Sequence, residues 1–504
     1  MSLRSRRSLV AVVLSAALAA IATPAAAAPA TGSSTGLFTG LSTLPDQLVG
    51  KTDVAGIDRH LIALQRLADS HDGNRAASTA GHGASAEYIA GKLEQAGYVV
   101  TRQEFPFVYT QTLAQKLTVD GAEHPVIVMT YSPATPEGGL TAPLAVIPVD
   151  PTPGCEAADY GDVAGKIVLV SRGACTFAQK QAAAADAGAL AAIIYNSEPG
   201  PLNGTLGDPA GARIPTGGIS QADGQALAGR DGATVTLDLR ELQENRTSYN
   251  VVAQTRTGRT DNVVMAGAHL DSVPEGPGIN DNGTGSATLL ETALELGSRP
   301  KVENAVRFAF WSAEEYGLVG STYYVDSLSF EQQLDIALYL NFDMIGSPNA
   351  AYFAYDGDDS DGVGAGPGPY GSAEIERVLT GYLNARGIST EGTDFDGRSD
   401  YGEFIAAGIP AGGLFTGAEG VKTPEQAAKW GGRAGVVYDP CYHQACDTLG
   451  NVDRTALDRN ADAVAYTLGT FASSTESVNG VKPGEPAVKP HRQATAKRVG
   501  TATG

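Results

Sequence analysis

Histidines and acids recur at the ends of successive predicted strands in the C-terminal half of the chain. They are His269 and Asp271 after the first strand, Asp281 in the next loop, Glu314 and Glu315 after the second strand, Asp343 after the third, and His443 in a late loop. Imidazole nitrogens and carboxylate oxygens are ligands that zinc takes in catalytic sites, where one coordination position is left for water. The set therefore predicts metal-assisted hydrolysis.

Five of these side chains suit a pair of zinc ions. A two-metal site holds its ions about 3.5–4 Å apart, so one ligand must bridge them. Asp281 suits the bridging position because its two carboxylate oxygens can each bind one ion. His269 and Asp343 could then hold one zinc ion. Glu315 and His443 could hold the other.

The other acids suit supporting tasks. Adjacent residues at a strand end point in different directions. One member of the pair Glu314 and Glu315 can therefore bind metal while the other acts as the general base. Asp271 lies two residues from His269, on the same side of the strand. It is placed to accept a hydrogen bond from the second ring nitrogen of His269 and so to fix the orientation of the ring.

Strands and helices alternate around these residues. Strands are predicted at 263–269, 306–311, 336–342 and 411–414, and helices at 287–296, 318–327, 373–385 and 455–471. Helices at 57–68 and 84–96 and a strand at 98–107 precede them. This order predicts an α/β fold with a mixed, largely parallel sheet sandwiched by helices. In such sheets, sites form at the carboxyl ends of strands, where the histidines and acids fall.

A different pattern fills residues 113–240. Short strands at 126–129, 145–148, 166–171 and 191–195 surround one alanine-rich helix at 179–187. We therefore expect an inserted β-rich domain at 113–240. It would divide the catalytic domain into residues 51–112 and 241–475.

The composition limits the partners of the protein. Its 504 residues include 35 Lys and Arg against 56 Asp and Glu, a formal net charge of −21. A protein that binds nucleic acid needs a basic surface to neutralise phosphates, so we expect no nucleic-acid partner. Hydrophobic residues make up 42% of the chain, which is enough for folded cores.

Both ends of the chain differ from its body. Arg4, Arg6 and Arg7 precede an apolar run at 8–22 and an alanine-rich stretch, which is the pattern of a signal peptide over residues 1–30. The run is shorter than the ~20 residues that span a bilayer, so we expect no membrane span in the mature protein. We interpret residues 31–50 as a linker or short pro-segment and 476–504 as a disordered or removable tail. The mature protein is expected to be secreted and extracellular, where disulfides persist.

Several segments resemble the zinc-dependent exopeptidase family that includes secreted streptomycete leucine-type aminopeptidases. They are 266–271, 278–285, 311–320, 340–348, 396–400, 412–417 and 441–447. The resemblance implies two Zn²⁺ ions held by His269, Asp281, Glu315, Asp343 and His443, with Glu314 as the base, Tyr442 stabilising the oxyanion and Asp271 orienting His269. It also implies a disulfide between Cys441 and Cys446.

The same resemblance bears on calcium. Members of the family bind Ca²⁺ through acids at the two ends of the domain, and Asp458 and Asp462 match the C-terminal pair. At the N-terminal end Lys51 falls in register and Asp53 lies two residues further on. The resemblance therefore leaves Ca²⁺ open.

The inserted domain resembles the protease-associated domain of several secreted peptidases. The resemblance is carried by residues 154–156, 165–170, 173–177 and 187–189. It implies a disulfide between Cys155 and Cys175. Two interpretations of the domain stay open: a lid or substrate-selecting module, or a packing domain without a ligand of its own.

The expected function is that of a secreted di-zinc aminopeptidase. The resemblance implies that a metal-bound water, with Glu314 as general base, releases large apolar, leucine-like residues from peptides with a free N-terminus. By resemblance, Arg398 lines the subsite for the amino end, and Met344 and Phe415 border the pocket for the first side chain. We expect a monomer. The alternatives are a carboxypeptidase or another zinc exopeptidase of the same fold, and a noncatalytic receptor-like module.

Overall fold

The structure is a computed structural model that describes residues 43–207, 209–364 and 366–486. Its catalytic part is built on parallel strands that pair side by side in the order β14 (Ala411–Phe415), β11 (Ile336–Phe342), β9 (Arg259–His269) and β10 (Asn304–Trp311). The sheet is completed by β8 (Thr234–Gln254), which is antiparallel to β10, and by β12 (Phe353–Tyr355) and β13 (Glu391–Thr393) beyond β14. The predicted α/β class with a mixed, largely parallel sheet is confirmed.

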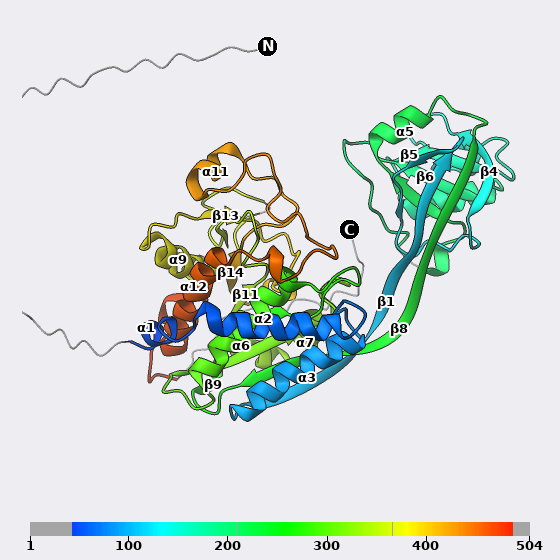
Figure 1. Cartoon of the computed structure of the whole chain (residues 1–504). Helices are drawn as coiled ribbons and strands as arrows, with labels where there is room; N and C mark the ends of the chain where they lie inside the picture. The colour runs from blue at the N-terminus through cyan, green and yellow to red at the C-terminus, as the bar shows by residue number, and fades with distance from the viewer. Residues whose placement is uncertain (1–42, 208, 365, 487–504) are drawn as a thin grey trace, which may run out of the picture. The chain divides into compact units, whose positions relative to one another are not determined.

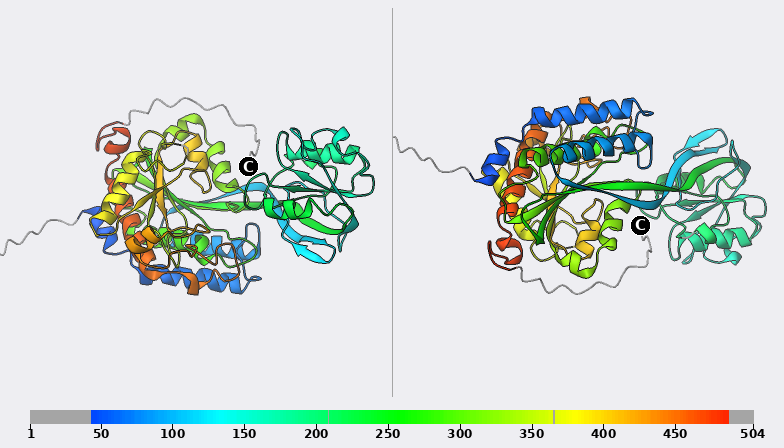
Figure 2. Two further views of the ribbon diagram at one scale, coloured as in Figure 1. Left: turned by 90° about the horizontal axis from the view of Figure 1, so that it is seen from above. Right: turned by 90° about the horizontal axis from the view of Figure 1, so that it is seen from below.

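Helices cover both faces of this sheet (Figure 2). Alternate side chains of β9 separate the two cores, because Val264 and Ala266 belong to one apolar cluster and Met265 belongs to the other. The first cluster receives α1 (Leu44–Val49), α2 (Val54–Asp69), α3 (Ala80–Gln95), α6 (Gly285–Leu296), α9 (Ser372–Asn384) and α12 (Arg454–Ser473). The second receives α7 (Val319–Ser327) and α10 (Gly402–Ala406). Short helices α8 (Phe330–Leu334), α11 (Pro424–Trp430) and α13 (Glu476–Asn479) lie between or after these elements.

The inserted domain has apolar cores of its own, and its strands continue the same sheet beyond β8. Its strands are β2 (Ala122–His124), β3 (Ile127–Val128), β4 (Leu140–Val146), β5 (Ile167–Ser171), β6 (Ala191–Tyr195) and β7 (Thr216–Ile219), with helices α4 (Phe177–Asp186) and α5 (Gln221–Leu227). Buried side chains of β5 and β6 divide between two apolar clusters that are separate from those of the catalytic part.

The two parts share one long ribbon. β1 (Val99–Val119) pairs with β8 in antiparallel register from Val99 opposite Gln254 to Val119 opposite Val235 (Figure 1). The predicted limits of the inserted domain, residues 113 and 240, lie inside these two continuous strands.

Parts of both predicted terminal segments are folded. Thr43 caps α1, and Leu48 on this helix is buried, so the end of the predicted 31–50 linker belongs to the folded body. Val478 on α13 and Val481 after it are also buried, which corrects the prediction of a disordered tail from 476 onward. A few apolar side chains suffice to dock such short segments on a neighbouring core. The predicted signal peptide at 1–30, residues 31–42 and residues 487–504 lie outside the described residues.

Two further predictions concern covalent and membrane features. Both predicted disulfides, Cys155–Cys175 and Cys441–Cys446, are formed. Among the described residues, no helix is both long enough and apolar enough to cross a bilayer.

Candidate active site

The end of β9 places His269 between two acids. The buried ring of His269 has its Nε2 atom 3.2 Å from Asp281 Oδ1 and 3.3 Å from Asp343 Oδ1. Asp343 directly follows β11, the strand next to β9, so neighbouring strand ends bring the two side chains together. Ser399 then fixes Asp343 by donating a 2.6 Å hydrogen bond to its Oδ2 atom.

A second histidine approaches the other side of Asp281. His443 Nε2 lies 3.3 Å from Asp281 Oδ2 and 3.0 Å from Glu315 Oε2. The two oxygens of Asp281 thus face the ring nitrogens of two different histidines. Ligand atoms of His269, Asp281 and Glu315 all lie within 4.8 Å of one another, as do those of His269, Glu314 and Asp343. The five predicted metal-binding side chains and Glu314 therefore form one cluster.

The cluster concentrates negative charge in a buried setting. Burial raises the pKa of Glu315 to about 7, and the nearby Asp281 carboxylate raises it too, whereas His443 lowers it. Its Oε1 atom is buried without a hydrogen-bond partner. Burial also raises the pKa of Glu314 well above its ordinary value, although His269 acts in the opposite direction. Crowded, partly unpaired carboxylates of this kind are stabilised by a cation, and the mixed nitrogen and oxygen donors fit zinc.

The turn that carries Asp281 is fixed by its neighbours. It is the buried segment Ile279–Thr284, just before α6, in which Asp281 and Asn282 have non-helical backbone angles. Asp447 accepts hydrogen bonds from the backbone N–H groups of Asn280 and Asp281, each at 2.9 Å. The side chain of Asn282 donates to Phe342 O at 2.9 Å and so ties the turn to the end of β11. These contacts come from distant parts of the sequence, and the spacing of the ligands gave no sign of them.

A short disulfide loop presents Tyr442 and His443. The Cys441–Cys446 bridge closes it with a sequence separation of 5, and the two rings stack with centroids 3.8 Å apart. Burial raises the pKa of Tyr442, and the nearby carboxylates of Asp281 and Glu315 raise it further. The phenol therefore stays protonated at neutral pH and can donate a hydrogen bond toward the pocket.

Asp271 is positioned differently from the expectation. His269 Nδ1 lies 3.0 Å from the backbone oxygen of Asp271, whereas the Asp271 carboxylate is 3.8 Å away. The carboxylate instead accepts the backbone N–H of Glu314 at 3.3 Å. The chain turns at the end of β9, which directs the carbonyl rather than the side chain toward the ring. Asp271 therefore contacts both His269 and the glutamate pair, by different groups.

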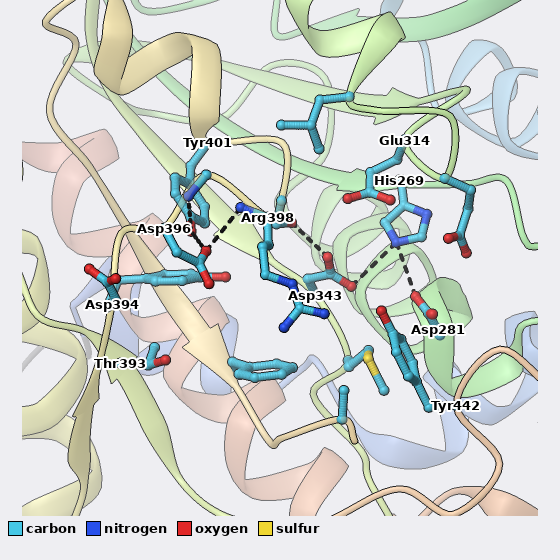
Figure 3. A pocket seen from close by; sticks show the side chains of 18 of the residues that line it. His269, Asp281, Glu314, Asp343, Thr393, Asp394, Asp396, Arg398, Tyr401 and Tyr442 are labelled. Carbon is cyan, nitrogen blue, oxygen red and sulfur yellow. Dashed lines mark hydrogen bonds and ion pairs between the residues drawn. The ribbon is translucent and has the colours of Figure 1, made fainter. Parts of the chain in front are cut away.

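The five predicted metal-binding side chains line a pocket of about 300 Å³ together with Glu314 and Tyr442 (Figure 3). Met344 and Phe415, expected beside the first side chain, line it together with Tyr442 and Tyr355. Arg398 also lines it and forms a 2.9 Å ion pair with Glu419. Sequence reasoning missed further lining residues, namely Tyr355, Thr393, Asp394, Asp396, Ser399 and Tyr401. The similarity noted at 396–400 was a signal that could have found two of them, Asp396 and Ser399.

The predicted calcium residues lie apart from these groups. Asp458 and Asp462 are one turn apart on α12, and burial and Asp458 raise the pKa of Asp462. Among the described residues, the groups of three metal-ligating side chains do not include them. A group of that size occurs instead at Asp356, Asp358 and Glu376.

Comparison with known proteins identifies the class. The family model of peptidase family M28 matches residues 250–468, and that of the PA domain, the protease-associated domain, matches residues 140–227. The chain belongs to peptidase family M28 and carries an inserted PA domain.

Two named relatives and one solved structure show which proteins this chain resembles. The chain is 49% identical over 428 residues to "Probable lipoprotein aminopeptidase LpqL" of Mycobacterium tuberculosis, a match that covers 84% of this chain and 85% of that protein. It is 45% identical over 437 residues to "Leucine aminopeptidase 2" of Trichophyton tonsurans, covering 86% of each. The solved structure of BSAP, a zinc aminopeptidase from Bacillus subtilis, superposes with a TM-score of 0.58 at 28% identity, covering 84% of this chain and 95% of that one.

Proposed function

We propose that this chain is a secreted di-zinc aminopeptidase that removes large apolar, leucine-like residues from peptides with a free N-terminus. The observation that carries the proposal is the position of Asp281, whose two oxygens each lie beside a ring nitrogen of a different histidine. The relatives named as aminopeptidases support the reaction, and the zinc aminopeptidase of Bacillus subtilis supports the metal. The chain is accordingly a zinc metallo-aminopeptidase of family M28.

The residues present fit two zinc ions. His269 and Asp343 would hold one ion and His443 and Glu315 the other, with Asp281 shared between them. Four acids lie beside these histidines in the pocket, namely Asp281, Glu314, Glu315 and Asp343. When ionised they carry four negative charges, which two divalent ions balance. Zinc bound there would polarise the scissile carbonyl and make a water molecule acidic near neutral pH.

Glu314 is the proposed general base. It lines the pocket, and a carboxylate oxygen of Glu314 lies within 4.8 Å of ligand atoms of His269 and Asp343. Burial raises the pKa of this carboxyl group, so its ionised form is a stronger base toward water than an exposed glutamate. The same group can return the proton to the leaving amine. Glu315 is assigned to the metal because its Oε2 atom contacts His443.

Tyr442 is the proposed donor to the oxyanion. Its hydroxyl is protonated at neutral pH, for the reasons given above, and the disulfide loop fixes the ring against His443. A preformed donor of this kind stabilises charge that develops on the carbonyl oxygen during attack.

The pocket supports the proposed specificity. Met344, Phe415 and Tyr355 give it an apolar side that suits a leucine-like first residue. The acids near His269 would attract a free α-amine, which restricts cleavage to the N-terminal residue. The name of the Trichophyton relative agrees with this preference. Export is supported by the predicted signal peptide and by two disulfides, which persist outside the cytoplasm.

Metal content and substrate blocking test the proposal together. The purified protein should contain two zinc ions, should hydrolyse leucyl p-nitroanilide, and should lose that activity to a chelator and regain it with zinc. Asp281→Asn should reduce both zinc content and activity, whereas the control Asp394→Asn, in the same pocket, should keep its zinc. One zinc ion per chain would refute the di-zinc site. Hydrolysis of N-acetylated substrates, or release of C-terminal residues, would favour another exopeptidase. Absence of both zinc and hydrolysis would favour a noncatalytic module.

A further inference from the structure

Arg75 is a fully buried arginine close to the proposed zinc site. Its relative exposure is 0%. It lies between α2 and α3, outside the residues 250–468 that the family model matches. Burying a guanidinium is unfavourable unless its N–H groups and its charge are both compensated. The partners of Arg75 therefore indicate what this buried charge does.

The side chain of Arg75 donates to three carbonyl oxygens of one loop. Nε donates to Pro277 O at 2.8 Å, Nη2 donates to Gly278 O at 2.5 Å, and Nη1 donates to Leu270 O. The backbone adds a contact to the same loop, because the Arg75 N–H donates to Ser272 Oγ at 2.9 Å. A planar guanidinium presents its donors in a fixed arrangement, so these acceptors are held in fixed positions relative to one another.

This loop separates two of the proposed zinc ligands. Leu270 directly follows His269, and Gly278 precedes Asp281 by three residues. Gly278 has φ of +60°, and a Cβ atom there would lie 3.2 Å from Arg75 Nη2 and 2.3 Å from Asp281 O. The guanidinium thus packs against the turn that leads into Asp281, while its other end holds the residue after His269.

The charge of Arg75 and its hydrogen bonds to the loop affect the affinity for zinc in opposite directions. Burial lowers the pKa of Arg75 to about 10, and acids that include Asp271, Asp447 and Asp281 counteract this, so the side chain is charged at neutral pH. A nearby positive charge repels Zn²⁺, so its removal alone would tighten zinc binding. A loop that no longer holds His269 and Asp281 together would weaken it.

We propose that Arg75 is a positioning residue for zinc, which holds the loop between His269 and Asp281 in the shape that lets both side chains bind one ion. The inference rests on the proposed function and deepens it, because it makes the segment before α3 a part of the metal site. Replacing groups that orient metal ligands typically lowers metal affinity by about 10- to 100-fold. We expect an effect of that size from the loss of geometry.

Two substitutions separate geometry from charge. Arg75→Lys keeps the charge but cannot hold three carbonyls in one plane, and Arg75→Met removes both. Zinc affinity is measured by competition with a chelator, with zinc as the only added ligand, and the stability of the metal-free protein is measured separately by denaturation. The control is Lys180→Met, which removes a buried cation that donates to Pro153 O in the inserted domain.

The expected result is a 10- to 100-fold loss of zinc affinity in Arg75→Lys, with activity recovered at saturating zinc because Arg75 touches no reacting atom. Lys180→Met should bind zinc as the wild type does. Wild-type affinity in Arg75→Lys together with tighter binding in Arg75→Met would overturn the inference and leave only a charge effect. If neither variant folds, Ser272→Ala decides, because it removes the hydroxyl that accepts the backbone N–H of Arg75 and so loosens the same segment from the loop. It should weaken zinc binding in the same direction. Failure of the wild type to bind zinc would instead refute the proposed function, and the inference with it.

Discussion

Removal of the Cys441–Cys446 disulfide should weaken the binding of one of the two zinc ions. The bridge closes a loop with a sequence separation of 5, which carries Tyr442 and His443. In the chain-entropy description, a cross-link of this length restricts the open loop by about 2 kcal/mol. That free energy lowers the relative population of the closed loop by about 30-fold when the bridge is absent. The double variant Cys441→Ser, Cys446→Ser should therefore bind the ion held by His443 about 30-fold more weakly.

The assay is a zinc titration of the metal-free protein, followed by both metal content and hydrolysis of leucyl p-nitroanilide. One ion should bind as in the wild type and the other at higher zinc concentration. The matched control is Cys155→Ser, Cys175→Ser, which opens a loop with a sequence separation of 20 in the inserted domain. That longer loop should cost more stability, about 3 kcal/mol, and leave both zinc ions unaffected. Wild-type zinc affinity in the first variant, or equal zinc loss in both, would refute the reasoning.

Three further predictions concern single side chains. Glu314→Gln cannot accept a proton, so kcat should fall by about 10²–10⁴-fold in initial-rate assays while metal analysis shows unchanged zinc, and wild-type kcat would contradict the assignment. Ser399→Ala removes the 2.6 Å hydrogen bond to Asp343; since bonds to charged groups contribute about 1.5–3 kcal/mol, zinc affinity in chelator competition should fall about 10- to 100-fold. Burial lowers the pKa of His82 to about 3, so the unfolded chain binds this proton up to about pH 6.5 while the folded chain does not. This residue should therefore make stability rise by about 1.4 kcal/mol per pH unit between those values, and urea denaturation of His82→Leu should show a slope smaller by that amount.

The regular elements of the catalytic part were predictable because their burial follows a simple period. The strand predicted at 336–342 coincides with β11, whose residues are all buried, as the continuous apolar run indicated. The full length of β1 was not predictable, because beyond 107 its side chains are mostly exposed or half-buried and polar. There the strand is held by its pairing with β8, a partner more than a hundred residues away. Such pairing leaves little trace in local sequence.

The residues of the site also divide into those that the sequence could predict and those that it could not. His269, Asp281, Glu315, Asp343 and His443 could be proposed from their chemical types at strand ends. The contacts of Asp447 and Ser399 with this group depend on tertiary structure, and so does the carbonyl, rather than carboxylate, contact of Asp271 with His269. The cis peptide bond between Asp281 and Asn282 likewise has no sequence signal. Residue type therefore identified the candidate ligands, whereas only the structure revealed the hydrogen bonds that hold them.

The β1–β8 ribbon has a consequence for protein engineering. The two strands stay paired from Val99 opposite Gln254 to Val119 opposite Val235, with one irregularity between Thr112 and Ala114. The inserted domain therefore occupies the place of a hairpin turn at the far end of one ladder. Thr110 stands opposite Gln243, beyond the rung of Tyr109 and Glu244, so a two-residue turn joining them would close the ladder there without changing its register. The PA domain could thus be excised, or exchanged for another module, at a single pair of positions. An insertion of one residue in either strand, by contrast, would reverse which face each following side chain occupies.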